Sequence, residues 1–138
     1  MVREKLLDML TLHEGLELKP YKCTSDKLTI GIGRNIEDIG ITEDEARYLL
    51  QNDVDRILKE VEHWTFLEKL SEPRQAVILD MVFNMGIVRF LKFKKTIAAI
   101  EEGDYIQASI EMLDSKWAKQ VGRRAVRLAE TMASGEFI

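Results

Sequence analysis

The sequence has 138 residues, of which 46% are hydrophobic and 32% charged, with one cysteine and two prolines. This length suits one domain with a single core, and one cysteine excludes an internal disulfide. A membrane-spanning helix needs about 20 consecutive apolar residues, and no run in the sequence approaches that length. No secretory signal stands at the start of the sequence. We therefore expect a globular protein that is made in the cytoplasm and does not insert stably into a membrane.

The net charge of −4 is unevenly distributed along the chain. Residues 1–70 hold 10 Lys and Arg against 15 Asp and Glu, whereas residues 71–138 hold 10 against 9. The run from Lys116 to Arg127 contains five basic residues and no acid. Such a run faces an anionic polymer in some proteins and is a solvated helix face in others. Because the chain as a whole is acidic, we expect no nucleic-acid partner.

The first forty residues predict a helix followed by a small sheet. Residues 3–13 place apolar side chains at helical spacing. Beyond Glu14 the period changes, and the stretch LTIGIG at residues 28–33 alternates as a strand does. Cys23 falls on the first turn of this hairpin or meander, and Thr29 falls on the returning strand.

A long helix is predicted from Thr42, because Thr42 and Glu45 have the spacing of a capping box. Apolar residues continue at helical spacing to Val61, which gives a helix of roughly 30 Å. Further helices are predicted at about 72–86, 93–101, 104–113 and 123–133. The fold class is therefore α+β and mostly helical, with a small β lobe and a helical lobe joined by a long helix. A cleft between two such lobes is the natural binding site.

Glu14, Cys23 and Thr29 bring a carboxyl, a thiol and a hydroxyl toward one edge of the predicted sheet. Cleavage of a glycosidic bond needs an acid for the leaving oxygen and a second group that activates water on the other side of the sugar. Each residue also has a structural explanation. A glutamate at a helix end is usually on the surface, and a lone cysteine is usually an inert buried thiol.

Four sequence blocks carry a family resemblance. The stretch HEGLELKPYKC…LTIGIGR resembles the signature of the phage-type lysozymes, glycoside hydrolase family 24, in which Glu, eight residues, Asp or Cys, five residues and Thr follow one another. The blocks GITEDEARYLLQNDVD, RQAVILDMVFNMG and SKWAKQVGRRAVR resemble the family's inter-lobe helix, central helix and C-terminal helix pair. The resemblance implies one lysozyme-like domain over residues 1–138. Its small lobe lies at about 14–41, its connecting helix at about 42–62, and its helical lobe at about 63–138 together with the N-terminal helix 3–13.

The resemblance also implies an activity. Members are endolysins, muramidases that hydrolyse the β-1,4 bond between N-acetylmuramic acid and N-acetylglucosamine in bacterial peptidoglycan and so lyse the host cell. We expect a monomer without cofactor or metal that waits in the host cytoplasm. A separate holin-like protein then gives it access to the periplasmic cell wall. The alternative is a catalytically inactive relative that binds peptidoglycan or a partner protein.

Four residues of the second half match positions that contact the saccharide in the family. Phe83 and Asn84 match residues along the saccharide path, and Lys116 matches a basic position beside the cleft. Arg124 matches an arginine that pairs with the catalytic glutamate. Core packing is the alternative for Phe83, and an ordinary exposed lysine is the alternative for Lys116.

The resemblance gives Glu14 the role of general acid and Thr29 that of holding the attacking water in an inverting reaction. Cys23 stands where the best-known members have Asp. We expect its thiol to orient water or to stabilise positive charge on the sugar, and a nucleophilic thiolate that forms a covalent glycosyl-enzyme is the alternative. Arg34 replaces a histidine that pairs with an aspartate on the connecting helix, and Asp53 falls at that aspartate's place. We therefore expect an Arg34–Asp53 pair.

Overall fold

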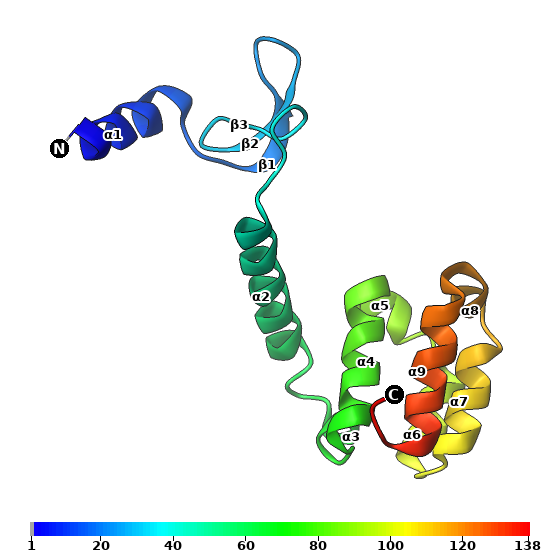
Figure 1. The fold of residues 1–138 in the computed structure, drawn as a ribbon. Helices are drawn as coiled ribbons and strands as arrows, with labels where there is room; N and C mark the ends of the chain where they lie inside the picture. Colours follow the sequence, from blue (N-terminus) through cyan, green and yellow to red (C-terminus); the bar gives the residue numbers. More distant parts are fainter. Residues whose placement is uncertain (1) are drawn as a thin grey trace. The chain divides into compact units, whose positions relative to one another are not determined.

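The computed structural model describes residues 2–138, in which nine helices and three strands follow one another (Figure 1). The elements are α1 (Val2–Glu14), β1 (Glu17–Lys22), β2 (Leu28–Gly31), β3 (Arg34–Asn35), α2 (Glu43–Glu60), α3 (Thr65–Glu68), α4 (Glu72–Met85), α5 (Ile87–Phe90), α6 (Lys94–Glu101), α7 (Tyr105–Leu113), α8 (Lys116–Val121) and α9 (Arg123–Ser134). The predicted α+β, mostly helical fold class is thus confirmed. The chain forms two compact units, residues 1–50 and 51–138, and the boundary falls within α2.

The small unit contains a three-stranded antiparallel meander in the order β1-β2-β3. Thr29 on the central strand lies opposite Tyr21 of β1 on one side and Asn35 of β3 on the other. Thr29 is 3% exposed and is the one buried side chain among the described residues 2–50. A polar residue therefore occupies the centre of this sheet, which agrees with the predicted placement of Thr29 on the returning strand.

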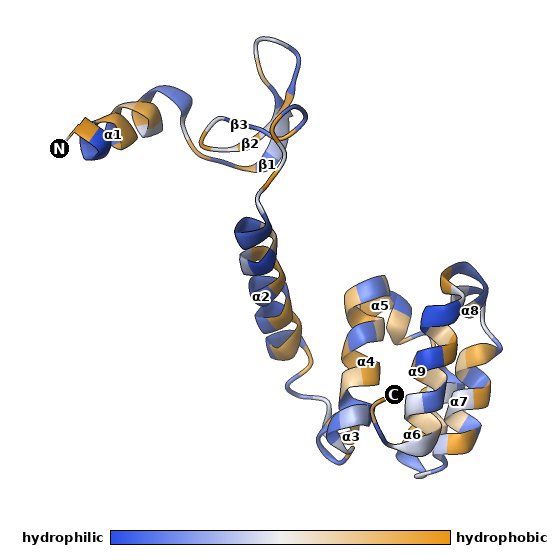
Figure 2. Cartoon of the chain, viewed as in Figure 1, coloured by the Kyte–Doolittle hydropathy of each residue, from blue (hydrophilic) through white to orange (hydrophobic). Residues whose placement is uncertain are grey.

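Helix α1 is amphipathic, and hydrophobic and hydrophilic residues alternate along it in Figure 2. Its side chains are exposed throughout residues 2–14, including the leucines of its apolar face, Leu6, Leu7 and Leu10. Amphipathic spacing thus predicted the helix correctly.

Helix α2 begins with the predicted capping box. The Thr42 hydroxyl accepts from the amide of Glu45 at 3.1 Å, and Glu45 Oε1 accepts from the amide of Thr42 at 2.8 Å. The same carboxylate also accepts two hydrogen bonds from the guanidinium of Arg34, at 2.9 and 2.8 Å. Glu45 therefore joins the end of the sheet to the first turn of α2.

The expected Arg34–Asp53 pair must be corrected, because both residues have other partners. Arg34 is held by Glu45 and by the carbonyl oxygen of Gly40, at 3.1 Å. Asp53 pairs with Arg56, three residues further along α2. Glu45 precedes Asp53 by about 12 Å at 1.5 Å per helical residue, so one guanidinium cannot bind both carboxylates. The Glu45 carboxylate is already held in the capping box, so Glu45 is a better partner for Arg34 than Asp53 is.

The helical unit is built around a hydrophobic core of aromatic rings and small side chains. Phe90 is fully buried and stacks against Trp64 and Phe93, with ring centroids 5.6 and 6.2 Å apart. Phe93 in turn meets Trp117 edge to face at 6.0 Å. Helices α4 and α9 contribute buried residues at helical spacing: Val77, Ile78, Met81, Val82 and Met85 from α4, and Ala125, Ala129 and Met132 from α9. The core thereby fixes α4 relative to α8 and α9.

The longer helices of this unit were predicted to within about two residues, whereas α3 and α5 were not predicted individually. Each of these has four residues, which is too few for a helical period to be recognised. No helix among the described residues is both long and apolar enough to cross a membrane.

The pairing of Arg34 with Glu45 predicts a measurable titration. Hydrogen bonds from the Arg34 guanidinium and the Thr42 amide lower the pKa of Glu45 to about 2. Because this folded-state pKa lies below that of an unfolded glutamate, about 4.3, the pair stabilises the fold above that pH. Its contribution disappears as the pH falls through the folded value. In an NMR titration we expect the Glu45 carboxyl to titrate near 2 in the wild type and closer to an ordinary glutamate in Arg34→Met.

Arg47→Met is the matched control, since Arg47 pairs with the exposed Glu43 on the same helix. It should leave the Glu45 midpoint where it is. A Glu45 midpoint that Arg34→Met does not change would contradict the assigned pair.

Candidate functional site

Glu14 is placed by two glycines. It is the last residue of α1, and Gly15, with a φ of +73°, ends the helix by donating from its amide to the carbonyl of Thr11 at 3.0 Å. The Glu14 side chain then lies against Gly33, in the turn between β2 and β3. A Cβ atom added at Gly33 would fall 2.7 Å from Glu14 Oε2 and 2.7 Å from its Cδ. The missing side chain of Gly33 therefore makes the room that the carboxyl occupies.

Cys23 and Thr29 are joined by the turn between β1 and β2. The carbonyl of Lys27 accepts from the amide of Cys23 at 3.0 Å and from the hydroxyl of Thr29 at 2.9 Å. The turn is closed by Asp26, whose amide donates to the carbonyl of Cys23 at 2.8 Å and whose φ is +59°. The structure thus brings two of the three predicted catalytic side chains together.

The Cys23 sulfur lies among hydrogen-bond donors. The backbone N–H of Lys27, then that of Ser25, and the hydroxyl of Thr29 lower the pKa of the Cys23 thiol. The Thr29 hydroxyl has a single proton, so the Lys27 carbonyl and the Cys23 sulfur compete for it. The thiol is half-buried. This environment therefore makes the Cys23 thiol more acidic than an unperturbed thiol.

In the helical unit, two of the predicted saccharide residues, Phe83 and Asn84, lie on α4, and Arg124 of α9 is paired with a residue of that helix. Asn84 Oδ1 accepts from Trp117 Nε1 at 2.7 Å, which fixes the amide group and leaves its NH₂ as a donor. One turn earlier, Asp80 Oδ1 accepts from Arg124 Nε at 2.8 Å. Phe83 lies between them in sequence and is 44% exposed, so it is not a core residue. Arg124 and Asn84 are therefore positioned by neighbouring turns of the same helix.

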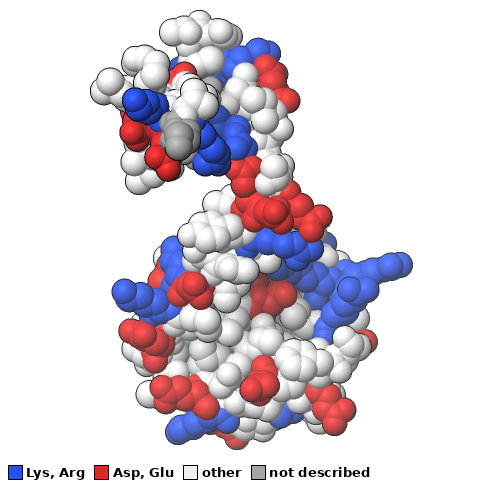
Figure 3. All heavy atoms as spheres, turned by 60° about the vertical axis from the view of Figure 1, so that its left-hand side comes forward, with Lys and Arg blue, Asp and Glu red and all other residues white. Residues whose placement is uncertain are grey.

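Lys116 begins α8, next to the buried Trp117, and its side chain is exposed. Lys116 and Lys119 lie on α8, and Arg123, Arg124 and Arg127 lie on α9. Figure 3 shows Lys and Arg side chains gathered on parts of the surface of the molecule. Among the described residues, Lys116 makes no ion pair. This surface is suited to an anionic or hydroxyl-rich ligand.

Sequence reasoning missed three groups that position the site. The clearance at Gly33 and the shared carbonyl of Lys27 appear only once the backbone is folded. Asp80, the partner of Arg124, has a sequence signal, because it lies four residues before Asn84 and so shares its helix face. Within residues 2–138, no group of three His, Cys, Asp or Glu side chains could hold a metal ion.

Comparisons with known proteins find relatives that match most of the chain. A family model described as phage lysozyme matches residues 11–131. The chain is 31% identical to "Probable T4-type lysozyme 1" of Dictyostelium discoideum, over 93% of each protein. It is 30% identical to "Endolysin" of Acyrthosiphon pisum secondary endosymbiont phage 1, over 89% of this chain and 85% of that one. It is also 29% identical to "Probable T4-type lysozyme 2" of Dictyostelium discoideum, over 94% of each.

The contact between Glu14 and Gly33 predicts a difference between two glycine substitutions. Gly31 and Gly33 have φ values of +72° and +73°, so alanine at either should cost about 1–2 kcal/mol of backbone strain. Only at Gly33 does an added Cβ collide with Glu14, since nothing lies within 4 Å of one at Gly31. We expect Gly33→Ala to change the ¹³C shift of the Glu14 carboxyl, with Gly31→Ala as the control that does not. Equal shift changes in both variants would exclude the contact.

Proposed function

Because the chain belongs to the phage lysozyme family, we propose that it hydrolyses the β-1,4 bond between N-acetylmuramic acid and N-acetylglucosamine. Membership makes it a lysozyme-type peptidoglycan hydrolase and a glycoside hydrolase-type enzyme. The bond cleaved and the use of this activity in host cell lysis are the proposal. The observation that supports them best is the Cys23–Thr29 pair on the same small meander that receives the carboxyl of Glu14.

Glu14 is the proposed general acid. Its carboxyl lies against the β2–β3 turn and makes no hydrogen bond within residues 2–50, so it is free to donate a proton to the glycosidic oxygen. The leaving sugar then departs as an alcohol, while positive charge develops on the other sugar ring. The close contact with Gly33 restricts the directions in which the acid can point.

Thr29 and Cys23 are the proposed groups that hold the attacking water. When the Thr29 hydroxyl donates to the Lys27 carbonyl, its lone pairs are available to accept a hydrogen bond from water. A neighbouring sulfur with a lowered pKa accepts the second hydrogen bond of that water, or stabilises the positive charge on the sugar. Attack by water on the face opposite the leaving group inverts the anomeric configuration, and the water passes its surplus proton to the acceptor that holds it or to bulk water.

On the helical unit, we assign Phe83, Asn84, Lys116 and Arg124 to saccharide binding. An exposed aromatic ring beside a fixed amide is a common arrangement for contacting a sugar ring and its acetamido group. Asn84 is held by Trp117, and Arg124 is held by Asp80, so both present preset donors. Preset donors lower the entropy cost of binding.

The biological proposal follows from the same family. We propose that the protein acts as a monomer, is held in the host cytoplasm until lysis, and reaches the cell wall when a separate holin-like protein permeabilises the membrane. One relative is named an endolysin. A catalytically inactive, peptidoglycan-binding protein is the rival proposal, and the replacement of Asp by Cys23 is the feature that favours it.

Clearing of Gram-negative cells whose outer membrane has been stripped tests the activity. We expect the wild type to lower the turbidity of the suspension and Glu14→Gln to lose at least 100-fold in rate, within the range of about 10²–10⁴ for general acid catalysis. Cys23→Asp should clear the cells, and Cys23→Ser should be slower than wild type. Gly33→Ala should clear the cells more slowly than wild type, whereas Gly31→Ala should clear them at the wild-type rate.

Two outcomes would contradict the proposal. A wild type that fails to clear cells while Cys23→Asp clears them would identify a silenced enzyme with a binding role. A Glu14→Gln variant as fast as wild type would remove Glu14 from the mechanism.

A further inference from the structure

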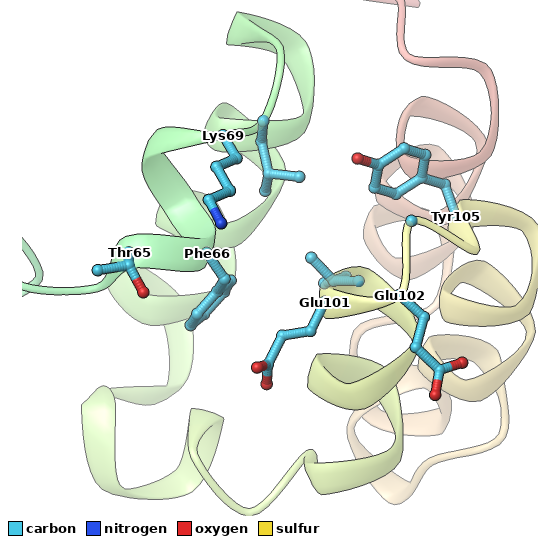
Figure 4. A pocket seen from close by; sticks show the side chains of 9 residues that line it. Thr65, Phe66, Lys69, Glu101, Glu102 and Tyr105 are labelled. Carbon is cyan, nitrogen blue, oxygen red and sulfur yellow. The ribbon is translucent and has the colours of Figure 1, made fainter.

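A cavity of about 280 Å³ opens on the helical unit between α3 and the turn that joins α6 to α7 (Figure 4). Phe66, Leu70 and Ile100 supply its apolar lining. Lys69, Glu101 and Tyr105 add polar groups. None of these residues belongs to the set assigned to the saccharide. The volume is sufficient for a ligand of a few heavy atoms.

Lys69 and Glu101 are exposed and Tyr105 is half-buried, so the polar groups of the cavity are accessible to a ligand. Figure 4 shows the Tyr105 hydroxyl pointing across the gap toward the wall that carries Lys69, the Lys69 side chain running down that wall toward Phe66, and the Glu101 carboxylate below, beside Phe66. Within residues 2–138, these three groups make no hydrogen bond or ion pair. The carboxylate of Glu102 points away from the gap. The cavity therefore presents one positive group, one negative group and one hydroxyl above an apolar surface.

Glu101 occupies an electrostatically unfavourable position. It is the last residue of α6, where the helix carries a partial negative charge that repels a carboxylate. The helix ends in a Schellman motif, since the amide of Gly103 donates to Ile100 O at 3.0 Å and that of Asp104 to Ala99 O at 2.9 Å. The backbone here is thus fixed. A cationic ligand group would be stabilised both by the Glu101 carboxylate and by the helix end.

Tyr105 is held rigidly from its other side. The guanidinium carbon of Arg74 lies 3.8 Å from the centre of the Tyr105 ring. Arg74 is itself anchored at the end of α9, donating to the carbonyls of Met132 at 2.7 Å and Ala133 at 3.0 Å. A Cβ added at Gly135 would come within 2.8 Å of the guanidinium. The Tyr105 hydroxyl is therefore directed into the cavity by a preorganised arrangement.

We propose that this cavity binds a small zwitterion, with its ammonium group at Glu101, its carboxylate at Lys69 and the Tyr105 hydroxyl, and its aliphatic part on Phe66, Leu70 and Ile100. Opposite charges on separate walls select a ligand that carries both, because a ligand with one charge gains only one of the two charge-assisted hydrogen bonds. A free amino acid and a short peptide with free ends share this chemistry. The proposal does not depend on the hydrolytic function.

The test is an NMR titration of the ¹⁵N-labelled full chain with L-alanine and with the dipeptide alanyl-alanine. We expect saturable shifts at the amides of Leu70, Gly103 and Tyr105. N-acetylalanine lacks the ammonium group and alaninamide lacks the carboxylate. Each should bind about tenfold more weakly than L-alanine, as expected for the loss of one charge-assisted hydrogen bond. Tighter binding of the dipeptide identifies peptides as the source, and tighter binding of L-alanine identifies free amino acids.

Variants assign each charge to its wall. Glu101→Gln should abolish the preference for L-alanine over N-acetylalanine, and Lys69→Met should abolish the preference over alaninamide. Glu102→Gln, which removes the same charge from the residue that points away, should change neither. Equal affinity of the wild type for all four compounds, or shifts absent from this cavity, would overturn the proposal. Because this readout needs no cell wall, its failure is distinct from a failure of the clearing assay.

Discussion

The geometry of the candidate catalytic pair depends on one backbone carbonyl, that of Lys27. It binds the amide of Cys23 and the hydroxyl of Thr29 at once, so the Cys23 backbone and the Thr29 side chain cannot separate without breaking the turn between β1 and β2. Closing that turn places Asp26 at a positive φ, which costs about 1–2 kcal/mol for most residues and less for Asp. Thr29, a buried polar residue, lies at the centre of the small sheet. The hydrogen bonds of this sheet position the candidate catalytic groups.

In the proposed mechanism, the Cys23 thiol takes the place of a carboxylate. A carboxylate carries its full charge at neutral pH, whereas an unperturbed thiol is mostly protonated. The amides of Lys27 and Ser25 and the hydroxyl of Thr29 lower the pKa of Cys23 and so recover part of the negative charge. The turn that holds the Thr29 hydroxyl therefore also lowers the pKa of the Cys23 thiol. In the proposed mechanism, the replacement of Asp by Cys23 keeps a hydrogen-bond acceptor next to the attacking water.

Local rules predicted much of this structure. Helical spacing gave the long helices, the capping box at Thr42 and Glu45 gave the start of α2, and strand alternation placed Thr29. The partner of Arg34 was not predictable from spacing, because α2 offers several carboxylates and only the folded turn selects Glu45. The clearance at Gly33 likewise needs the three-dimensional approach of Glu14, since a glycine in a strand sequence has many explanations.

The central claim is that water held by Thr29 and Cys23 attacks the sugar directly. The anomeric configuration of the first product tests it most directly, read by ¹H NMR as soon as the enzyme meets a soluble peptidoglycan oligosaccharide and before mutarotation. Direct attack on the β-glycoside yields the α-anomer first. A first product in the β configuration would contradict the account, because retention requires two successive displacements, with the Cys23 thiolate as the candidate nucleophile of the first.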